Sequence, residues 1–265
     1  MKVAFVKLPR NLRSTNGLTL VELMIAITIS FVSILGIYRM FSASLRSYNL
    51  QTQLTQMHQD ATFSIHKISE ALMQVGSALP QKNYQIIYGD ADSVCLLANS
   101  TGSSYTFSSN LLSSNIIVMT DASAFKNQTF ILKDSLDSSV TKFTISKVDT
   151  NAVQDTIFLT TSGTFYSGTT IYGANTFYYY KSGTNIMFKQ DTGSASVLAE
   201  NIDSLSFTYY TSSHAATTNW TQFYSVNIYL RARTALPDPK YKYPGINDGY
   251  RRVPMSIEVR FRNKI

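Results

Sequence analysis

An apolar run over residues 18–38 opens the hydrophobic pattern of the chain, and a single acid interrupts it. The acid is Glu22, and 16 uncharged residues follow it before the next charge, Arg39. As a helix the run is roughly 31 Å long at ~1.5 Å per residue, enough to cross the hydrocarbon core of a bilayer. The pattern therefore predicts a membrane-spanning helix with a carboxylate near its start.

The helical pattern continues beyond the apolar run as a stripe of apolar residues spaced three or four apart. Its members are Leu50, Leu54, Met57, Ala61, Ile65, Ile68, Leu72 and Val75. That spacing places them on one helical face, and Gly76 and Pro80 then supply a stop signal. We predict one continuous helix from about Leu18 to Val75, with an amphipathic second half. Because no second long helix is predicted downstream, we expect the stripe to pack on a β-sheet of the same chain.

From residue 84 the pattern changes to short β-forming runs, separated by segments rich in Ser, Thr, Asn and Gly. The predicted strands are 84–88, 93–98, 115–119, 140–148, 156–160, 175–181, 185–190, 204–210, 224–231 and 255–262. The tripeptide 182–184 predicts a hairpin, whereas 100–104, 161–170 and 235–249 are predicted as loops.

These elements predict an α+β fold, in which a long N-terminal helix packs on an antiparallel, β-rich C-terminal head. The expected organisation is a leader over residues 1–17, a long helix over 18–76 and a head over 77–265. Within the helix, residues 18–38 would form the membrane or filament core, and residues 39–76 the amphipathic part.

The charge of the chain is concentrated at its start. The net charge is +7, and residues 1–17 contribute four basic side chains and no acid, so +3 remains without them. Positive charge before an apolar helix keeps the leader in the cytoplasm and directs the C-terminal side outward. The leader lacks the apolar segment and small-residue cleavage site of an ordinary secretory signal, so we expect a different kind of targeting segment.

Side chains that could catalyse a reaction or bind a metal do not occur at the spacing of any known catalytic or metal-binding motif. Cys95 is the only cysteine, which excludes an intrachain disulfide and a thiolate metal site. We attribute the histidines to solvated or packing roles and the acidic pairs to turns and caps. The side chains concerned are His58, His66 and His214, together with the pairs Asp90–Asp92 and Asp134–Asp137. We therefore expect no enzyme activity, no cofactor and no metal.

The C-terminal residues 227–265 carry nine basic against three acidic side chains, and tyrosines are interleaved among them. The set is Arg231, Arg233, Lys240, Lys242, Arg251 and Arg252, with Tyr229, Tyr241, Tyr243 and Tyr250. Such interleaving can bind a phosphate backbone and stack bases, which makes a nucleic acid a candidate partner. Salt-bridged strands and loops produce the same pattern, and we favour that explanation.

Glu22 requires an explanation, because a carboxylate inside a membrane helix costs about 2.5–3.5 kcal/mol on insertion scales. One explanation is a position near the interface, from which the side chain reaches water. Pairing with Arg39 is excluded within one helix, because the two lie ~25 Å apart along the axis. The third explanation is a positive charge on another molecule. Cleavage after Gly17 would create an α-amino group on Leu18, which Glu22 of a neighbouring chain would meet in a staggered array of helices.

The segment Gly17-Leu18-Thr19-Leu20-Val21-Glu22-Leu23 resembles the class III signal of type IV pilins and type II secretion pseudopilins. The match comprises the short basic leader, the glycine before the cut, the glutamate five residues after it and the long apolar helix. The resemblance implies that a prepilin peptidase cleaves the Gly17–Leu18 bond and N-methylates Leu18, and that Glu22 acts in assembly. Leu18 departs from the phenylalanine usual at that position, a departure that cleavage in the family tolerates.

Beyond the signal, the chain resembles the PilW-like minor pilins. The segments that carry this resemblance are Ser47–Gln51, Val197–Ile202, Leu205–Tyr210 and Asp248–Arg252. The J-type pseudopilin of type II secretion shares a related helix, strand order and size class, and is the close rival. Major pilins usually carry a C-terminal disulfide, and many have a proline in the helix, whereas this chain has neither.

The resemblance implies a minor pilin that primes pilus assembly, sits at or near the pilus tip, and supports motility, adhesion or DNA uptake. The implied partners are other minor pilins, the major pilin, the prepilin peptidase and the inner-membrane assembly platform. Before assembly the chain would cross the inner membrane once with its head in the periplasm, and afterwards it would belong to the pilus. The alternatives are a J-type pseudopilin and a membrane-tethered binding protein that never polymerises.

Overall fold

A computed structural model describes residues 19–79, 86–99, 101–134, 140–150, 154–219 and 222–262 of the chain. The chain divides into two compact units, residues 1–52 and residues 53–265. The described part of the first unit is helical from Leu20 onward. The second unit contains the rest of the same helix and the β-strands.

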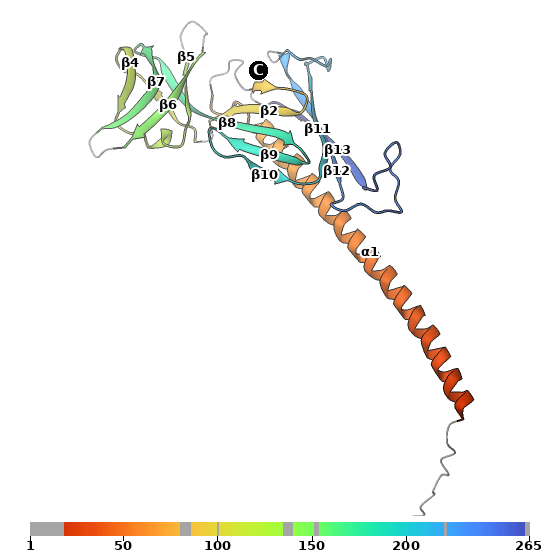
Figure 1. The fold of residues 1–265 in the computed structure, drawn as a ribbon. Helices are drawn as coiled ribbons and strands as arrows, with labels where there is room; N and C mark the ends of the chain where they lie inside the picture. The colour runs from red at the N-terminus through yellow and green to blue at the C-terminus, as the bar shows by residue number, and fades with distance from the viewer. Residues whose placement is uncertain are drawn as a thin grey trace, which may run out of the picture. The chain divides into compact units, whose positions relative to one another are not determined.

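The helix α1 spans Leu20–Gln74 and confirms the long N-terminal helix (Figure 1). It ends before Gly76, which adopts a φ of 70° and donates its N–H to the Leu97 carbonyl at 3.1 Å. A glycine in the left-handed region is a frequent helix terminator, because it lacks a Cβ that would clash. Every described side chain up to residue 49 is exposed. An apolar helical surface of this length requires burial in lipid or among other helices.

All paired strands of the second unit run antiparallel, which confirms the predicted α+β class. The larger sheet has the strand order β1-β2-β8-β5-β6-β7-β4. In addition, β3 and β9 each pair with β8, and β10 pairs with β9. The smaller sheet has the strand order β11-β12-β13. The strands are β1 Ile86–Gly89, β2 Ser93–Ala98, β3 Ser104–Thr106, β4 Leu111–Met119, β5 Phe130–Asp134, β6 Val140–Asp149, β7 Asp155–Phe165, β8 Thr170–Ser182, β9 Asn185–Gln190, β10 Ser196–Ala199, β11 Ile202–Tyr210, β12 Ser225–Arg233 and β13 Arg252–Arg260.

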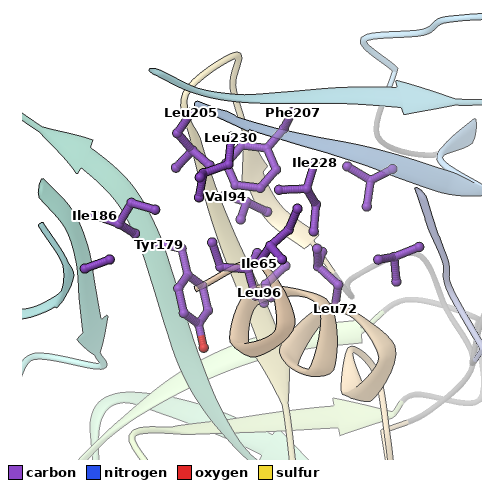
Figure 2. Close-up of a cluster of buried hydrophobic side chains, with 14 of the residues drawn as sticks. Ile65, Leu72, Val94, Leu96, Tyr179, Ile186, Leu205, Phe207, Ile228 and Leu230 are labelled. Atoms are coloured by element: carbon purple, nitrogen blue, oxygen red, sulfur yellow. The ribbon is translucent and has the colours of Figure 1, made fainter. Parts of the chain in front are cut away.

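The distal half of α1 is the centre of a hydrophobic core. Six residues of the predicted stripe are buried in it: Met57, Ala61, Ile65, Ile68, Leu72 and Val75. They pack against residues of both sheets, among them Val94 and Leu96 of β2 and Leu205, Ile228 and Leu230 of β11 and β12 (Figure 2). The predicted packing of the stripe on a β-sheet is therefore confirmed, and the helix contacts two sheets rather than one.

A second hydrophobic core lies among β3–β7 and the first half of β8, and the sequence pattern did not predict it. Its fully buried members include Ile117, Phe125, Ile131, Ile157, Phe165 and Ile171. The long strand β8 joins the two cores, because its first half pairs with β3 and β5 and its second half pairs with β2 and β9. The hairpin predicted at residues 182–184 is the β8–β9 connection, where Gly183 has a φ of 59°.

Three strands were missed by the sequence prediction: β3, β5 and β10. In β5, Phe130, Ile131 and Leu132 form a continuous apolar run with no alternation. The loop predicted over 161–170 is shorter in the structure, because β7 extends to Phe165 and β8 begins at Thr170, and β3 begins at the last residue of the loop predicted over 100–104. Residues 235–249 contain none of the strands, as predicted. Residues 84 and 85 of the first predicted strand lie outside the described residues.

Replacing Leu72 with Ala should lower the free energy of unfolding of the head by about 2–5 kcal/mol, because Leu72 is fully buried and its removal leaves a cavity. Urea unfolding of the full chain in detergent, followed by tryptophan fluorescence, measures the change. The matched control is Met73→Ala, because Met73 is the next residue of α1 and is 36% exposed. A control effect as large as that of Leu72→Ala would contradict the assignment of the buried face.

Candidate functional site

The N-terminus of α1 is a reciprocal cap formed by Thr19 and Glu22. Thr19 Oγ1 accepts the N–H of Glu22 at 3.3 Å, and Glu22 Oε2 accepts the N–H of Thr19 at 2.9 Å. Thr19 Oγ1 also donates to Glu22 Oε2 at 3.0 Å, and the Thr19 carbonyl accepts the first helical bond, from Leu23 N–H. Together these bonds form a capping box, which satisfies amide groups that the first helical turn otherwise leaves unpaired.

The cap fixes the position of the Glu22 carboxylate at the start of an apolar surface. Neighbouring side chains are highly exposed: Leu20 by 74%, Val21 by 63% and Leu23 by 52%. Only Oε2 of Glu22 accepts hydrogen bonds from described residues, so Oε1 is available as an acceptor. The site therefore presents an oriented carboxylate, with one oxygen engaged at the helix end, within an apolar surface.

The predicted processing residues Gly17 and Leu18 lie outside the described residues. The structure describes the chain from Thr19, whose N–H belongs to the peptide bond that follows Leu18. Glu22 thus accepts a hydrogen bond from the amide one residue after the predicted cut.

Thr19 is a site residue that the sequence analysis missed. Its signal was present, because a Thr followed three residues later by Glu, just before an apolar helix, is the sequence pattern of a capping box.

The basic C-terminal region is held by carboxylates within the head. Arg252 Nε donates to Asp203 at 3.0 Å and its Nη1 donates to Asp248 at 2.9 Å, while Arg231 pairs with Asp203 at 2.6 Å. The hydrogen bond from Arg252 is the main cause that lowers the pKa of Asp248, to about 2. Burial alone would raise the pKa of Asp203, but hydrogen bonds and charges from Arg252 and Arg231 outweigh it and lower the pKa.

Further arginines of this region stack on tyrosine rings. Arg251 pairs with Asp238 at 3.2 Å and lies 4.6 Å from the centroid of the Tyr241 ring. Arg233 lies 4.4 Å from the centroid of the Tyr250 ring. All four arginines of the interleaved set thus have partners in the head. This supports salt-bridged strands and loops over the nucleic-acid interpretation of the same pattern.

Among the residues that the structure describes, no three His, Cys, Asp or Glu side chains are grouped so that they could hold a metal ion. His58 and His66 are exposed on α1, and His214 stacks on the Tyr210 ring at 4.5 Å. Asp137 lies outside the described residues.

Residues 12–38 match the family described as the prokaryotic N-terminal methylation motif. The matched range includes Gly17, Leu18 and Glu22, together with the apolar run. No curated protein and no solved structure matches the chain.

The match explains the features of the N-terminal region together. This motif is a class III signal, which implies processing by prepilin peptidase and assembly with other pilins. α1 is long and apolar enough to cross a membrane, which supports membrane anchoring followed by incorporation into a pilus. A structural role of this kind points away from an enzyme. With a class III signal, a long apolar helix and an antiparallel β-rich head, the chain has a pilin-like α+β architecture and is consistent with a type IV pilin-like protein.

Proposed function

We propose that the chain is a minor type IV pilin of the PilW-like group, a structural subunit that primes pilus assembly and sits at or near the pilus tip. The observation that carries this proposal is the methylation motif at the start of an exposed apolar helix, with an oriented Glu22 in its first turn. The lack of an internal disulfide and of a helix proline favours a minor over a major subunit. In that place it would support motility, adhesion or DNA uptake.

The proposed mechanism begins with cleavage of the Gly17–Leu18 bond by the prepilin peptidase and N-methylation of Leu18. The new amine is the positive charge that Glu22 requires when the helix enters a filament of staggered subunits. Since Oε1 of Glu22 accepts no hydrogen bond from a described residue, it can accept the amine of the next chain while Oε2 maintains the cap. The charge pair would be directional and would set the axial register between subunits.

The proposed organisation assigns residues 1–17 to the removed leader, 18–76 to the helix and 77–265 to the head. Before assembly the chain would cross the inner membrane once, with its head in the periplasm. It would then meet the assembly platform, other minor pilins and the major pilin. Pilus-associated genes beside its own would favour this function, whereas neighbouring secretion genes would indicate a J-type pseudopilin.

Mass spectrometry of the mature chain should find Leu18 at the N-terminus, carrying one added methyl group. Chain from a strain without prepilin peptidase is the control and should retain residues 1–17. An intact Met1 in the normal strain, or a cut at any other bond, would contradict the proposed processing.

A further inference from the structure

We propose that a cleft beside β11 binds one residue of an extended polypeptide segment from another protein, which runs parallel to β11. The cleft has a volume of about 540 Å³ and lies in the head, on the edge of β11 that does not pair with β12. It is lined by residues 89–91, 207–209 and 216–218. Ligand-binding pockets in proteins typically have volumes of roughly 300–1,000 Å³.

The hydrogen bonds at this edge show which backbone groups face the cleft. Phe207 N–H donates to the Ala91 carbonyl at 2.8 Å, and the Tyr209 carbonyl accepts the N–H of Thr217 at 2.9 Å. Alternate residues of an antiparallel strand direct their backbone groups to opposite edges, so Phe207 and Tyr209 both face away from β12. Their remaining groups, the Phe207 carbonyl and the Tyr209 N–H, have no hydrogen-bond partner on this edge among the described residues.

The two segments that flank the cleft, residues 89–91 and 216–218, turn away from β11 instead of continuing its backbone hydrogen-bond ladder. On one side, Ala91 N–H donates to Asp90 Oδ1 at 2.7 Å rather than to β11. On the other side, Asn219 N–H donates to Thr217 Oγ1 at 3.1 Å, directly after the bridge that Thr217 makes to β11. The local turns therefore leave one donor and one acceptor of β11 open between them.

The spacing of the two open groups fits a single residue of a parallel strand. In a parallel ladder, one residue donates to the carbonyl before its partner residue and accepts from the N–H after it. Phe207 C=O and Tyr209 N–H have this relation to Thr208. An antiparallel residue would exchange both its bonds with one residue of β11, either Phe207 or Tyr209, and each has one group already engaged. Strand addition of this kind is a common mode of peptide recognition.

The walls of the cleft favour a peptide over a sugar. Phe207 and Tyr209 are each only 5% exposed as whole residues, so the cleft offers no exposed ring on which a sugar could stack. Gly89, Ala91 and Ala216 contribute small side chains or none. A Cβ on Gly89 would come within 2.6 Å of the Tyr209 hydroxyl, so this wall can carry no larger residue without rearrangement. A segment with small side chains facing the cleft can therefore approach the edge closely.

The probe for the test is the capped peptide acetyl-Ala-Thr-Val-Thr-Ala-amide, and the readout is hydrogen exchange at the backbone amide of Tyr209 in the full chain in detergent. We expect millimolar peptide to slow this exchange saturably. The Phe207 amide is the internal reference, because it is already bonded to Ala91. The same peptide with an N-methylated central valine cannot donate to Phe207, and we expect it to bind about tenfold more weakly or worse.

A variant that fills the cleft provides the second arm. Ala216→Trp should abolish the protection of Tyr209, whereas Val197→Trp should not, because Val197 is 48% exposed on β10 and does not line the cleft. The proposal is wrong if Tyr209 gains no protection, if the N-methylated peptide binds equally well, or if Ala216→Trp binds like the unchanged chain. It is also wrong if N-acetylglucosamine, and not the peptide, protects Tyr209. Should Ala216→Trp misfold, the comparison of the two peptides on the unchanged chain still decides.

Discussion

Replacing Arg252 with Met should destabilise the head by roughly 3 kcal/mol, at the lower end of the cost of breaking a buried ion pair. The Arg252 side chain is 2% exposed, and its partner Asp203 is 17% exposed. The Met side chain fills part of the same volume but leaves Asp203 with Arg231 alone. Equilibrium urea unfolding at neutral pH, with the full chain in detergent, gives the difference in free energy.

The matched control is Arg260→Met, on the same strand β13. Arg260 is exposed and lies 5.0 Å from the centroid of the Tyr224 ring, a contact worth about 0.5–1 kcal/mol at an exposed site. Arg252 pairs with Asp203 of β11 and with Asp248 of the loop over residues 235–249. If Arg252→Met lowers the free energy of unfolding no more than Arg260→Met does, these ion pairs do not hold the loop to the sheet.

The same variant should change the dependence of stability on pH. Asp248 has a pKa lowered from 3.8 to about 2, chiefly by its hydrogen bond from Arg252. A lowered carboxyl pKa contributes stability that is fully present above 3.8 and is lost as the pH falls towards 2. Without Arg252 the largest part of this contribution is lost, so the difference in unfolding free energy between the two chains should narrow between pH 4 and about 2. A constant difference across that range would contradict the role of the pair.

The helix and its buried face could be predicted because the spacing of apolar residues determines which side chains share a face. Ile65, Ile68 and Leu72 follow one another by three and four residues, and all three are buried. The second core could not be predicted in the same way. It depends on which strands pair, and the pairing of β8 with both β2 and β5 joins segments far apart in the sequence.

The candidate functional residues likewise include some that could be predicted from the sequence and some that could not. Glu22 was found from the sequence because a charge inside an apolar run is conspicuous, and Thr19 was identifiable from its spacing. The partners of the arginines in the basic C-terminal region could be predicted from that region only in part, because Asp238 and Asp248 lie within it but Asp203 does not. The counter-ion that Arg231 and Arg252 share, Asp203, lies 49 residues before Arg252, and only the folded arrangement of β11, β12 and β13 brings the three side chains together.

Replacing Glu22 with Gln should prevent incorporation of the chain into pili while leaving membrane insertion intact. The amide of Gln can still accept the Thr19 N–H, because Gln also serves at the third position of a capping box. It carries no charge for the amine of a neighbouring chain. A hydrogen bond between charged groups contributes about 1.5–3 kcal/mol, so each subunit contact should weaken roughly ten- to hundredfold. Incorporation is measured by probing sheared surface pili for this chain, and membrane insertion by probing the membrane fraction for it.

The variant Thr19→Ala separates the two roles of Glu22. It removes the cap, at about 1 kcal/mol of helix stability, and retains the carboxylate. If Glu22 acts only as a helix cap, Thr19→Ala should impair incorporation at least as much as Glu22→Gln. If its charge recruits the neighbouring amine, Thr19→Ala should assemble and Glu22→Gln should not. Normal pili containing the Glu22→Gln chain would exclude the charge-pair mechanism, even if cleavage after Gly17 were established, because processing and assembly depend on different atoms of the same short segment.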